Sequence, residues 1–249
     1  MLLRLIILCF FLSMPSWSIA ADVDAKTIIQ KVQDLMRSHT STARYTMQIQ
    51  TSDWQRSISF QSWDERIENR FFIRVLSPRK EKDTAWLKSD KNLWMYLPKL
   101  ERDIRIPASM MLSSWMGSDF TNDDLVKMDS VVEDYKHRIL SQGKHSITIE
   151  STAKPDAPVV WGKIIHVVNY NGIPLSDDYY DEHGVHIRHL VFSEVRMMDG
   201  RRIPTLWSMQ PLNDKGKKTL LKLEEATFDK PIAGHIFTRA NLRRASSRR

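Results

Sequence analysis

The sequence predicts one large domain built mainly from β-strands, with a few short helices. Many short segments alternate apolar and polar residues with a period of two, and Gly-containing turns separate them. The connections between these segments are short, so neighbouring strands should pair antiparallel. We therefore expect a mostly β, α+β fold with a single, strongly bent antiparallel sheet, and not a row of βαβ units.

The chain begins with a segment typical of a secretory signal. Arg4 precedes the unbroken apolar run from Leu5 to Leu12, and Ser18-Ile19-Ala20 supplies the small residues that signal peptidase requires. The run is too short to cross a bilayer. We therefore expect residues 1–20 to be a cleaved signal and residues 21–249 to form one domain in a bacterial periplasm. An N-terminal membrane anchor is the alternative.

Removal of that signal removes Cys9, the only cysteine, so the mature chain has no disulfide, no Cys-ligated metal and no thiol nucleophile. The formal charge of +7 becomes +6 without Arg4. Export argues against nucleic acid as a partner, so the excess charge would meet anionic lipid or acidic protein. Much of it lies in "RANLRRASSRR", where we expect residues 243–249 to be a frayed, solvated tail, with a binding arm as the alternative.

The first half of the mature chain predicts one helix followed by strands. Asp22 or Asp24 can cap a helix through "AKTIIQKVQDLMR", in which apolar residues recur at helical spacing. From Ala43 the period is two, with apolar residues at Tyr45, Met47, Ile49, Ile58, Phe60, Phe71, Ile73 and Val75. The segment Asn92–Leu97 is apolar on both faces, so we expect it to be covered on both sides or to line a binding site.

The second half repeats the strand pattern. Hairpin turns are predicted at Asn171-Gly172, His183-Gly184 and Asp199-Gly200. The strand candidates are "HSITIE", "GKIIHVVNY", "IPLSDDYYD", "VHIRHLVFSEVRMM", "RIPTLWSMQ" and "KTLLKLEEATF".

Three short helical segments complete the predicted elements. Pro107 to Gly117 has proline at its first position and glycine just past its end, which predicts a helix. "TNDDLV" predicts another helical turn, with Thr121 or Asn122 as its cap. "IFTRANLRR" predicts a last short helix near the C-terminus.

Neither a metal site nor a catalytic site is predicted, and we expect no cofactor. His183 lies in a turn, and His186 and His189 differ by an odd number on a strand, so they should point to opposite faces. No nucleophile elbow or Gly-rich phosphate loop occurs. Acidic pairs such as Asp123-Asp124 and Asp177-Asp178 fall where solvated carboxylates are ordinary. We therefore favour a protein that is not an enzyme.

The methionine-rich segment after Pro107 is the strongest functional signal. Methionine is unbranched and polarizable, so it adapts to apolar partners of different shapes. One interpretation is a mobile lid over an apolar cavity, with Trp94 and Tyr96 either in the cavity wall or on the opposite face of their strand. The other interpretation is ordinary core. The lid candidates are Met110, Met111, Leu112, Trp115 and Met116.

The same region resembles the LolA-like outer-membrane lipoprotein-sorting family, in particular the branch found with RND-type transporters. The matching residues are "LWMYLP" (93–98), "RIP" (105–107) and "MGSDFTNDDL" (116–125). The helix at the N-terminus, "SPRKEKDTAWL", the hairpin from Asp199 to Met209 and "FTRANLRR" are also similar to that family. The chain departs from it at "ASMMLSSW", which is more apolar than the corresponding segment of relatives.

The resemblance implies an open half-barrel, in which one antiparallel sheet curls around an apolar interior and helices lie across its mouth. It also implies a monomeric periplasmic carrier for a lipid or the acyl chains of a lipoprotein. The implied partners are an inner-membrane RND- or MMPL-type transporter and an outer-membrane acceptor. The alternative function is a non-transporting lipid sensor or accessory subunit that regulates an inner-membrane partner. A lipid hydrolase would need a nucleophile that the sequence does not suggest.

Overall fold

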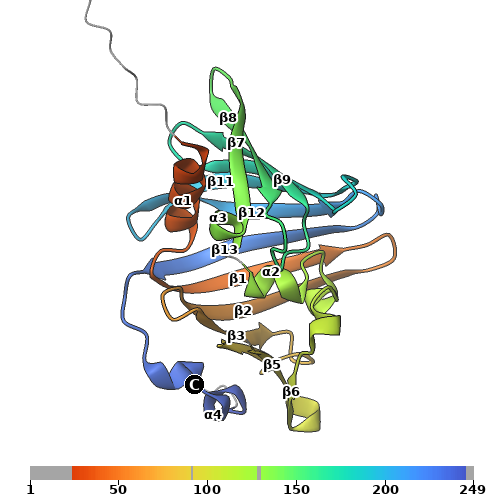
Figure 1. The fold of residues 1–249 in the computed structure, drawn as a ribbon. Coiled ribbons are helices and arrows are strands. Elements are labelled where there is room, and N and C mark those ends of the chain that lie inside the picture. The colour runs from red at the N-terminus through yellow and green to blue at the C-terminus, as the bar shows by residue number, and fades with distance from the viewer. Residues whose placement is uncertain (1–23, 91, 128–129, 245–249) are drawn as a thin grey trace, which may run out of the picture.

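A computed structural model describes residues 24–90, 92–127 and 130–244. They form one curved, open antiparallel sheet of 13 strands, in the order β6-β5-β4-β3-β2-β1-β13-β12-β11-β10-β9-β8-β7 (Figure 1). The predicted single antiparallel sheet is confirmed. The strands are β1 (Thr40–Gln50), β2 (Gln55–Glu65), β3 (Arg70–Ser77), β4 (Ala85–Ser89), β5 (Asn92–Leu97), β6 (Arg102–Arg105), β7 (Tyr135–Gln142), β8 (Ser146–Ala153), β9 (Lys163–Asn169), β10 (Pro174–Tyr180), β11 (His186–Met198), β12 (Arg201–Pro211) and β13 (Lys218–Phe228).

The helices are short except for α1, which has 12 residues. No helix in the described ranges is long and apolar enough to span a membrane. The predicted signal, residues 1–20, lies outside the described residues. The α-helices are α1 (Ala25–Met36), α2 (Asn122–Val126), α3 (Ser130–Glu133) and α4 (Arg239–Leu242), and the 3-10 turns are η1 (Pro98–Leu100), η2 (Ala108–Met110), η3 (Trp115–Gly117) and η4 (Gly234–Phe237).

The strand order determines where the chain between the two halves must run. Strands β1 to β6 form one antiparallel meander and β7 to β13 form another, and β13 pairs with β1 in the middle of the sheet. The two edge strands, β6 and β7, are therefore consecutive in the sequence. The connection between them has to cross from one edge of the sheet to the other, and it carries η2, η3, α2 and α3 across one face.

The two faces of the sheet are covered by different segments. We call the face that carries α1, α2 and α3 the inner face, and the opposite one the outer face. Strand β5 shows the division, because Leu93 and Met95 pack in the inner cluster with Trp115, whereas Trp94 and Tyr96 pack in an outer cluster with Leu242. Successive side chains of a strand point to opposite faces, so a strand that is apolar on both sides is covered on both sides.

The C-terminal segment, residues 232–244, covers the part of the outer face formed by β2 to β5, at the bottom of Figure 1. Phe237 and Leu242 are buried there, and Leu242 is fully inaccessible. The Arg243 guanidinium pairs with the Asp103 carboxylate at 2.8 Å, and Arg74 donates to the carbonyl of Arg244. We expected residues 243–249 to fray, but Arg243 and Arg244, the first two residues of that tail, make these specific contacts. Residues 245–249 lie outside the described part of the chain.

The prediction of one helix from Pro107 to Gly117 is wrong. The segment forms two separate 3-10 turns, η2 and η3, of three residues each. Met116 has a left-handed φ of 56° and Gly117 a φ of 77°, and a right-handed helix cannot continue through such residues. The Met111 carbonyl accepts a hydrogen bond from the N–H of Asp123 at 2.8 Å, so it bonds to α2 and not along a helix of its own.

The prediction that His186 and His189 point to opposite faces is also wrong. Both imidazoles approach the same carboxylate oxygen, Oδ1 of Asp178, at 2.9 and 2.5 Å. The register between β10 and β11 shifts by one residue, since Tyr179 is opposite Arg188 but Tyr180 is opposite His186. This β-bulge changes the side on which His186 emerges, and strand parity alone could not anticipate it.

Candidate functional site

We call residues 106–126 the lid segment. Its last part is anchored by a capping box, in which the hydroxyl of Thr121 accepts from the N–H of Asp124 at 3.2 Å and the Asp124 carboxylate accepts from the N–H of Thr121 at 2.7 Å. Of the two predicted caps, Thr121 and Asn122, the structure has Thr121. The Asn122 side chain instead donates to the carbonyl of Met110 at 3.0 Å, which ties α2 to η2.

Trp115 lies at the centre of the lid segment and is 2 % exposed. Its ring meets those of Phe60 and Trp86 edge-on, with centroids 5.2 and 5.6 Å apart. Such aromatic pairs add attraction beyond the burial of apolar area. The indole Nε1–H is buried and has no hydrogen-bond partner among the described residues. Trp115 therefore plugs the apolar centre of the inner face.

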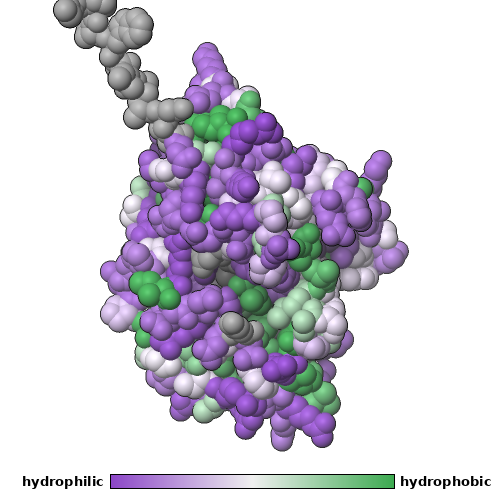
Figure 2. All heavy atoms as spheres, in the orientation of Figure 1, coloured by the Kyte–Doolittle hydropathy of each residue, from purple (hydrophilic) through white to green (hydrophobic). Residues whose placement is uncertain are grey.

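The other four lid candidates divide into two pairs. Met111 and Met116 are partly buried against the same inner cluster as Trp115. Met110 and Leu112 point into solvent and are 46 % and 59 % exposed. Figure 2 shows apolar surface around the lid segment and the adjoining edge of the sheet, with hydrophilic residues around it. The lid segment is thus apolar both towards the sheet and towards its surroundings.

Trp94 and Tyr96 lie on the outer face, which settles the alternative that strand parity left open. The guanidinium of Arg239 stacks over the Trp94 ring at 4.0 Å, and Tyr96 is buried beneath the C-terminal segment. These two side chains cannot line a cavity under the lid. Their neighbours Leu93 and Met95 face the lid segment instead.

Polar contacts hold the rim of the lid segment to four strands. Lys88 of β4 donates to the carbonyl of Val126 at 2.6 Å, and Arg56 of β2 donates to the carbonyl of Met116. The Asp119 carboxylate accepts from the hydroxyl of Thr219 of β13 at 2.6 Å and pairs with Lys217 at 3.1 Å. The fourth contact comes from β11.

That contact is a bidentate ion pair between Arg188 and Asp124, with nitrogen–oxygen distances of 2.8 and 2.5 Å. The guanidinium packs over the rings of both Trp161 and Tyr179, 4.3 and 4.4 Å from their centroids, and these two rings also contact each other. Burial alone would raise the pKa of Asp124, but the charge and hydrogen bonds of Arg188, with those of Thr121, hold that pKa below its usual range. Removal of either partner would leave a buried charge.

Two other acidic residues, Asp123 and Asp177, are also less solvated than the sequence predicts. Asp123 is 7 % exposed, and burial raises the pKa of its carboxyl even though Lys127 pairs with it at 3.0 Å. Asp177 lies within β10 and not in a turn, and its Oδ1 is 2.7 Å from Nδ1 of His166. The expectation that Asp123, Asp124 and Asp177 are solvated is therefore wrong, because the lid and inner face bury them against cationic or imidazole partners.

The His166–Asp177 pair is a feature that sequence reasoning missed. His166 interrupts the apolar strand "KIIHVVN" at a position whose register partner is Ile149, a fully buried residue of the inner face. A polar residue at an inward position of an apolar strand is the signal that identifies it. The imidazole Nε2 is buried without a hydrogen-bond partner in the described part of the chain.

A serine hydroxyl and an imidazole are in contact on β7 and β8. The hydroxyl of Ser151 lies 2.8 Å from Nδ1 of His137, but Nε2 of His137 faces the carbonyl of Val132 at 3.3 Å and no carboxylate orients the ring. Within the described ranges, no three His, Cys, Asp or Glu side chains form a group that could hold a metal ion.

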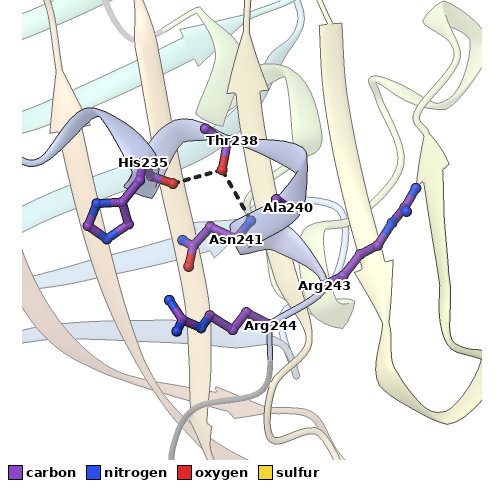
Figure 3. Close-up of a pocket in the computed structure, with 6 residues that line it drawn as sticks. All are labelled: His235, Thr238, Ala240, Asn241, Arg243 and Arg244. Atoms are coloured by element: carbon purple, nitrogen blue, oxygen red, sulfur yellow. Dashed lines mark hydrogen bonds between the residues drawn. The ribbon is translucent and has the colours of Figure 1, made fainter.

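One surface pocket lies away from the lid segment (Figure 3). Its volume is about 370 Å³, and exposed residues of the C-terminal segment provide most of its lining. Its position among exposed side chains on the outer side makes it a shallow depression, so we do not assign the functional site to it. The lining residues are His235, Thr238, Ala240, Asn241, Arg243 and Arg244.

Solved structures with the same architecture identify the class of fold. A DUF1329 family protein from Desulfovibrio piger has a TM-score of 0.79 and 20 % identity, over 88 % of this chain and 97 % of its own. An outer-membrane lipoprotein-sorting protein domain from Vibrio parahaemolyticus, described as putative, has a TM-score of 0.76 and 20 % identity, over 88 % of this chain and 98 % of its own. A LolA superfamily protein from Nitrosomonas europaea has a TM-score of 0.74 and 18 % identity, over 88 % of this chain and 99 % of its own. The chain thus has the LolA-like fold that its sequence motifs predict.

The family itself is shown by sequence. A family model described only as "Uncharacterized protein" matches residues 68–244, more than half of the chain, and the chain belongs to that family. None of the curated proteins compared with the chain matches it.

Proposed function

We propose that this protein is a periplasmic carrier that binds the acyl chains of a lipid or lipoprotein under the lid segment, without catalysis. The observation that carries the proposal is the lid itself, in which Trp115 fills an apolar centre while polar side chains hold the rim. If the lid moves out, it uncovers an apolar surface that an acyl chain matches. The likeness in fold to LolA-like lipoprotein-sorting domains supports the same function.

The energies are of suitable size. Withdrawal of a buried tryptophan from a packed site costs about 3–5 kcal/mol. Burial of an acyl chain of about 16 carbons is favourable by on the order of 10 kcal/mol, at roughly 0.8 kcal/mol per methylene. Cargo of this length can therefore offset the withdrawal of Trp115, whereas a short apolar solute cannot.

The proposal includes partners and a route. We propose that the monomer receives its cargo from an inner-membrane RND- or MMPL-type transporter and delivers it to an outer-membrane acceptor. A carrier has to release what it binds, so its affinity should be moderate and its lid should reopen. A sensor would instead hold its ligand tightly.

A reversible lock on the lid tests the proposal. The side chains of Asp119 and Thr219 are in hydrogen-bond contact at 2.6 Å, one in the lid segment and one in β13. The only natural cysteine, Cys9, lies in the predicted signal, so the double variant Asp119→Cys/Thr219→Cys would carry the two thiols alone. We expect the oxidised variant to lose binding of a fluorescent fatty-acid probe and to regain it on reduction.

The reduced double variant is the matched control, because it differs from the locked form only by the disulfide. Mass spectrometry under denaturing conditions verifies the bond. Equal probe affinity in the locked and reduced forms would refute binding under the lid. Native mass spectrometry of protein released gently from the periplasm would then identify any lipid carried elsewhere on the molecule.

A further inference from the structure

The imidazole of His166 has a buried ring nitrogen, Nε2, that the described residues of the inner face leave without a hydrogen-bond partner, as they leave the indole Nε1–H of Trp115. The side chain of His166 is 9 % exposed. Its register neighbours across the inner face are Ile149 on β8 and Asp177 on β10, and Asp177 is in turn opposite Leu190 on β11. The ring therefore lies in the sheet's apolar lining with a single polar neighbour in its row.

The pairing with Asp177 determines which hydrogen-bonding role the free nitrogen has. A carboxylate only accepts hydrogen bonds, so Nδ1 of His166 carries the proton that Asp177 receives at 2.7 Å. In the neutral ring Nε2 is then an acceptor, and the carboxylate behind the ring makes it a stronger one. Nε2 is inaccessible to solvent and has no partner among residues 24–90, 92–127 and 130–244.

A buried acceptor without a donor is costly, and native proteins rarely keep one unless something else satisfies it. The nearest charge determines which ligand would fit. The carboxylate of Asp177 lies 2.7 Å from the His166 ring, and the Arg188 guanidinium on β11 is already paired with Asp124. An anionic head group would approach a carboxylate and an acceptor nitrogen, so it is disfavoured and a neutral donor is favoured.

We propose that His166, positioned by Asp177, is a polar binding site for a neutral hydrogen-bond donor, a hydroxyl or an amide N–H, carried by an otherwise apolar ligand. The inference rests on the proposed function, because the ligand reaches the inner face only if the lid opens. It adds selectivity to that function. The protein distinguishes hydroxylated or amide-linked acyl ligands from plain hydrocarbon and from esters, which only accept.

The test compares ligands of one chain length in the whole protein. 1-Tetradecanol and N-methylmyristamide carry a donor, methyl myristate carries only acceptors, and tetradecane carries neither. Each displaces a neutral fluorescent hydrocarbon, diphenylhexatriene, from the wild type and from His166→Phe. The ratio of the two affinities for one ligand cancels that ligand's own solubility. We expect His166→Phe to weaken binding of the alcohol and of the amide about two- to ten-fold, which is the range of one net hydrogen bond. Binding of the ester and of the alkane should stay unchanged.

The matched control is His189→Phe, the same change on the neighbouring part of the sheet but on the outer face, where His189 contacts Asp178. This variant should leave the affinity for each of the four ligands unchanged. Equal effects of His166→Phe on alcohol and ester would overturn the inference and leave the carrier proposal standing. Failure of every ligand to displace the probe from the wild type would instead refute the carrier proposal.

A measurement on the wild type covers the case in which His166→Phe does not fold. In protein labelled with ¹⁵N-histidine, the Nε2 resonance of a ring that gains a donor shifts. We expect one such resonance to shift with 1-tetradecanol and not with methyl myristate. No selective shift in any histidine would contradict the assignment.

Discussion

The Arg188–Asp124 pair should be the strongest polar contact between the lid segment and the sheet. Its side chains are 5 % and 18 % exposed, and two hydrogen bonds join them. Arg188→Met leaves the Asp124 carboxylate buried beside Asp123 without its cation. We expect this to lower the free energy of unfolding by about 3–5 kcal/mol, the usual cost of breaking a buried pair from one side.

The double variant Arg188→Met/Asp124→Leu makes the prediction specific. Apolar residues that replace both partners remove the uncompensated charge, so the double variant should be more stable than the sum of the two single variants predicts, by roughly 2 kcal/mol or more. Arg138→Met is the control, since Arg138 is 70 % exposed in its pair with Glu150 and should contribute at most about 1 kcal/mol.

Urea denaturation measures these differences, and the m-value has to stay constant for the comparison to hold. Amide hydrogen exchange in α2 separately measures how readily the lid segment leaves the sheet. If the pair exists only in the closed state, a loss of about 3 kcal/mol raises the opening constant on the order of a hundred-fold. A cost below about 1 kcal/mol for Arg188→Met, or strictly additive single variants, would refute the role of this pair.

Three further predictions follow from the packing. If Trp115 is only a core residue, Trp115→Ala should lower the free energy of unfolding by about 3–5 kcal/mol. If the lid segment opens readily, the loss should be smaller and the affinity for the fatty-acid probe should change clearly. Leu112→Ala, at an exposed position, is the control and should cost about 0.5 kcal/mol or less. Burial raises the pKa of Tyr179 well above its usual value, so its neutral phenol stabilises the fold below about pH 10 and the contribution is lost as the pH rises further; Tyr179→Phe should flatten the alkaline loss of stability in a pH series of denaturation curves. Leu242→Ala should cost about 2–5 kcal/mol by thermal or chemical denaturation, whereas a cost near zero would mean that the C-terminal segment does not stabilise the outer face.

The sequence by itself determined the elements whose signals are local. The change from helical to alternating spacing places α1 and β1, and the Gly-containing turns at Gly172, Gly184 and Gly200 have the positive φ that hairpins require. The capping box that starts at Thr121 needs only residues within one helical turn. The methionine-rich composition marked the lid segment because composition does not depend on the backbone path.

Only the tertiary structure decided what depends on residues far apart in the chain. Arg188 and Asp124 are 64 residues apart, and neither is identifiable as a partner until β11 and α2 meet on the inner face. The side on which Trp94 lies was open because both faces of β5 are apolar, and it was decided by the C-terminal segment that covers one of them. The helix predicted from Pro107 gave way to two turns because its backbone groups bond to α2, and a one-residue bulge moved His186. Propensity and parity describe a segment alone, whereas these outcomes follow from what packs against it.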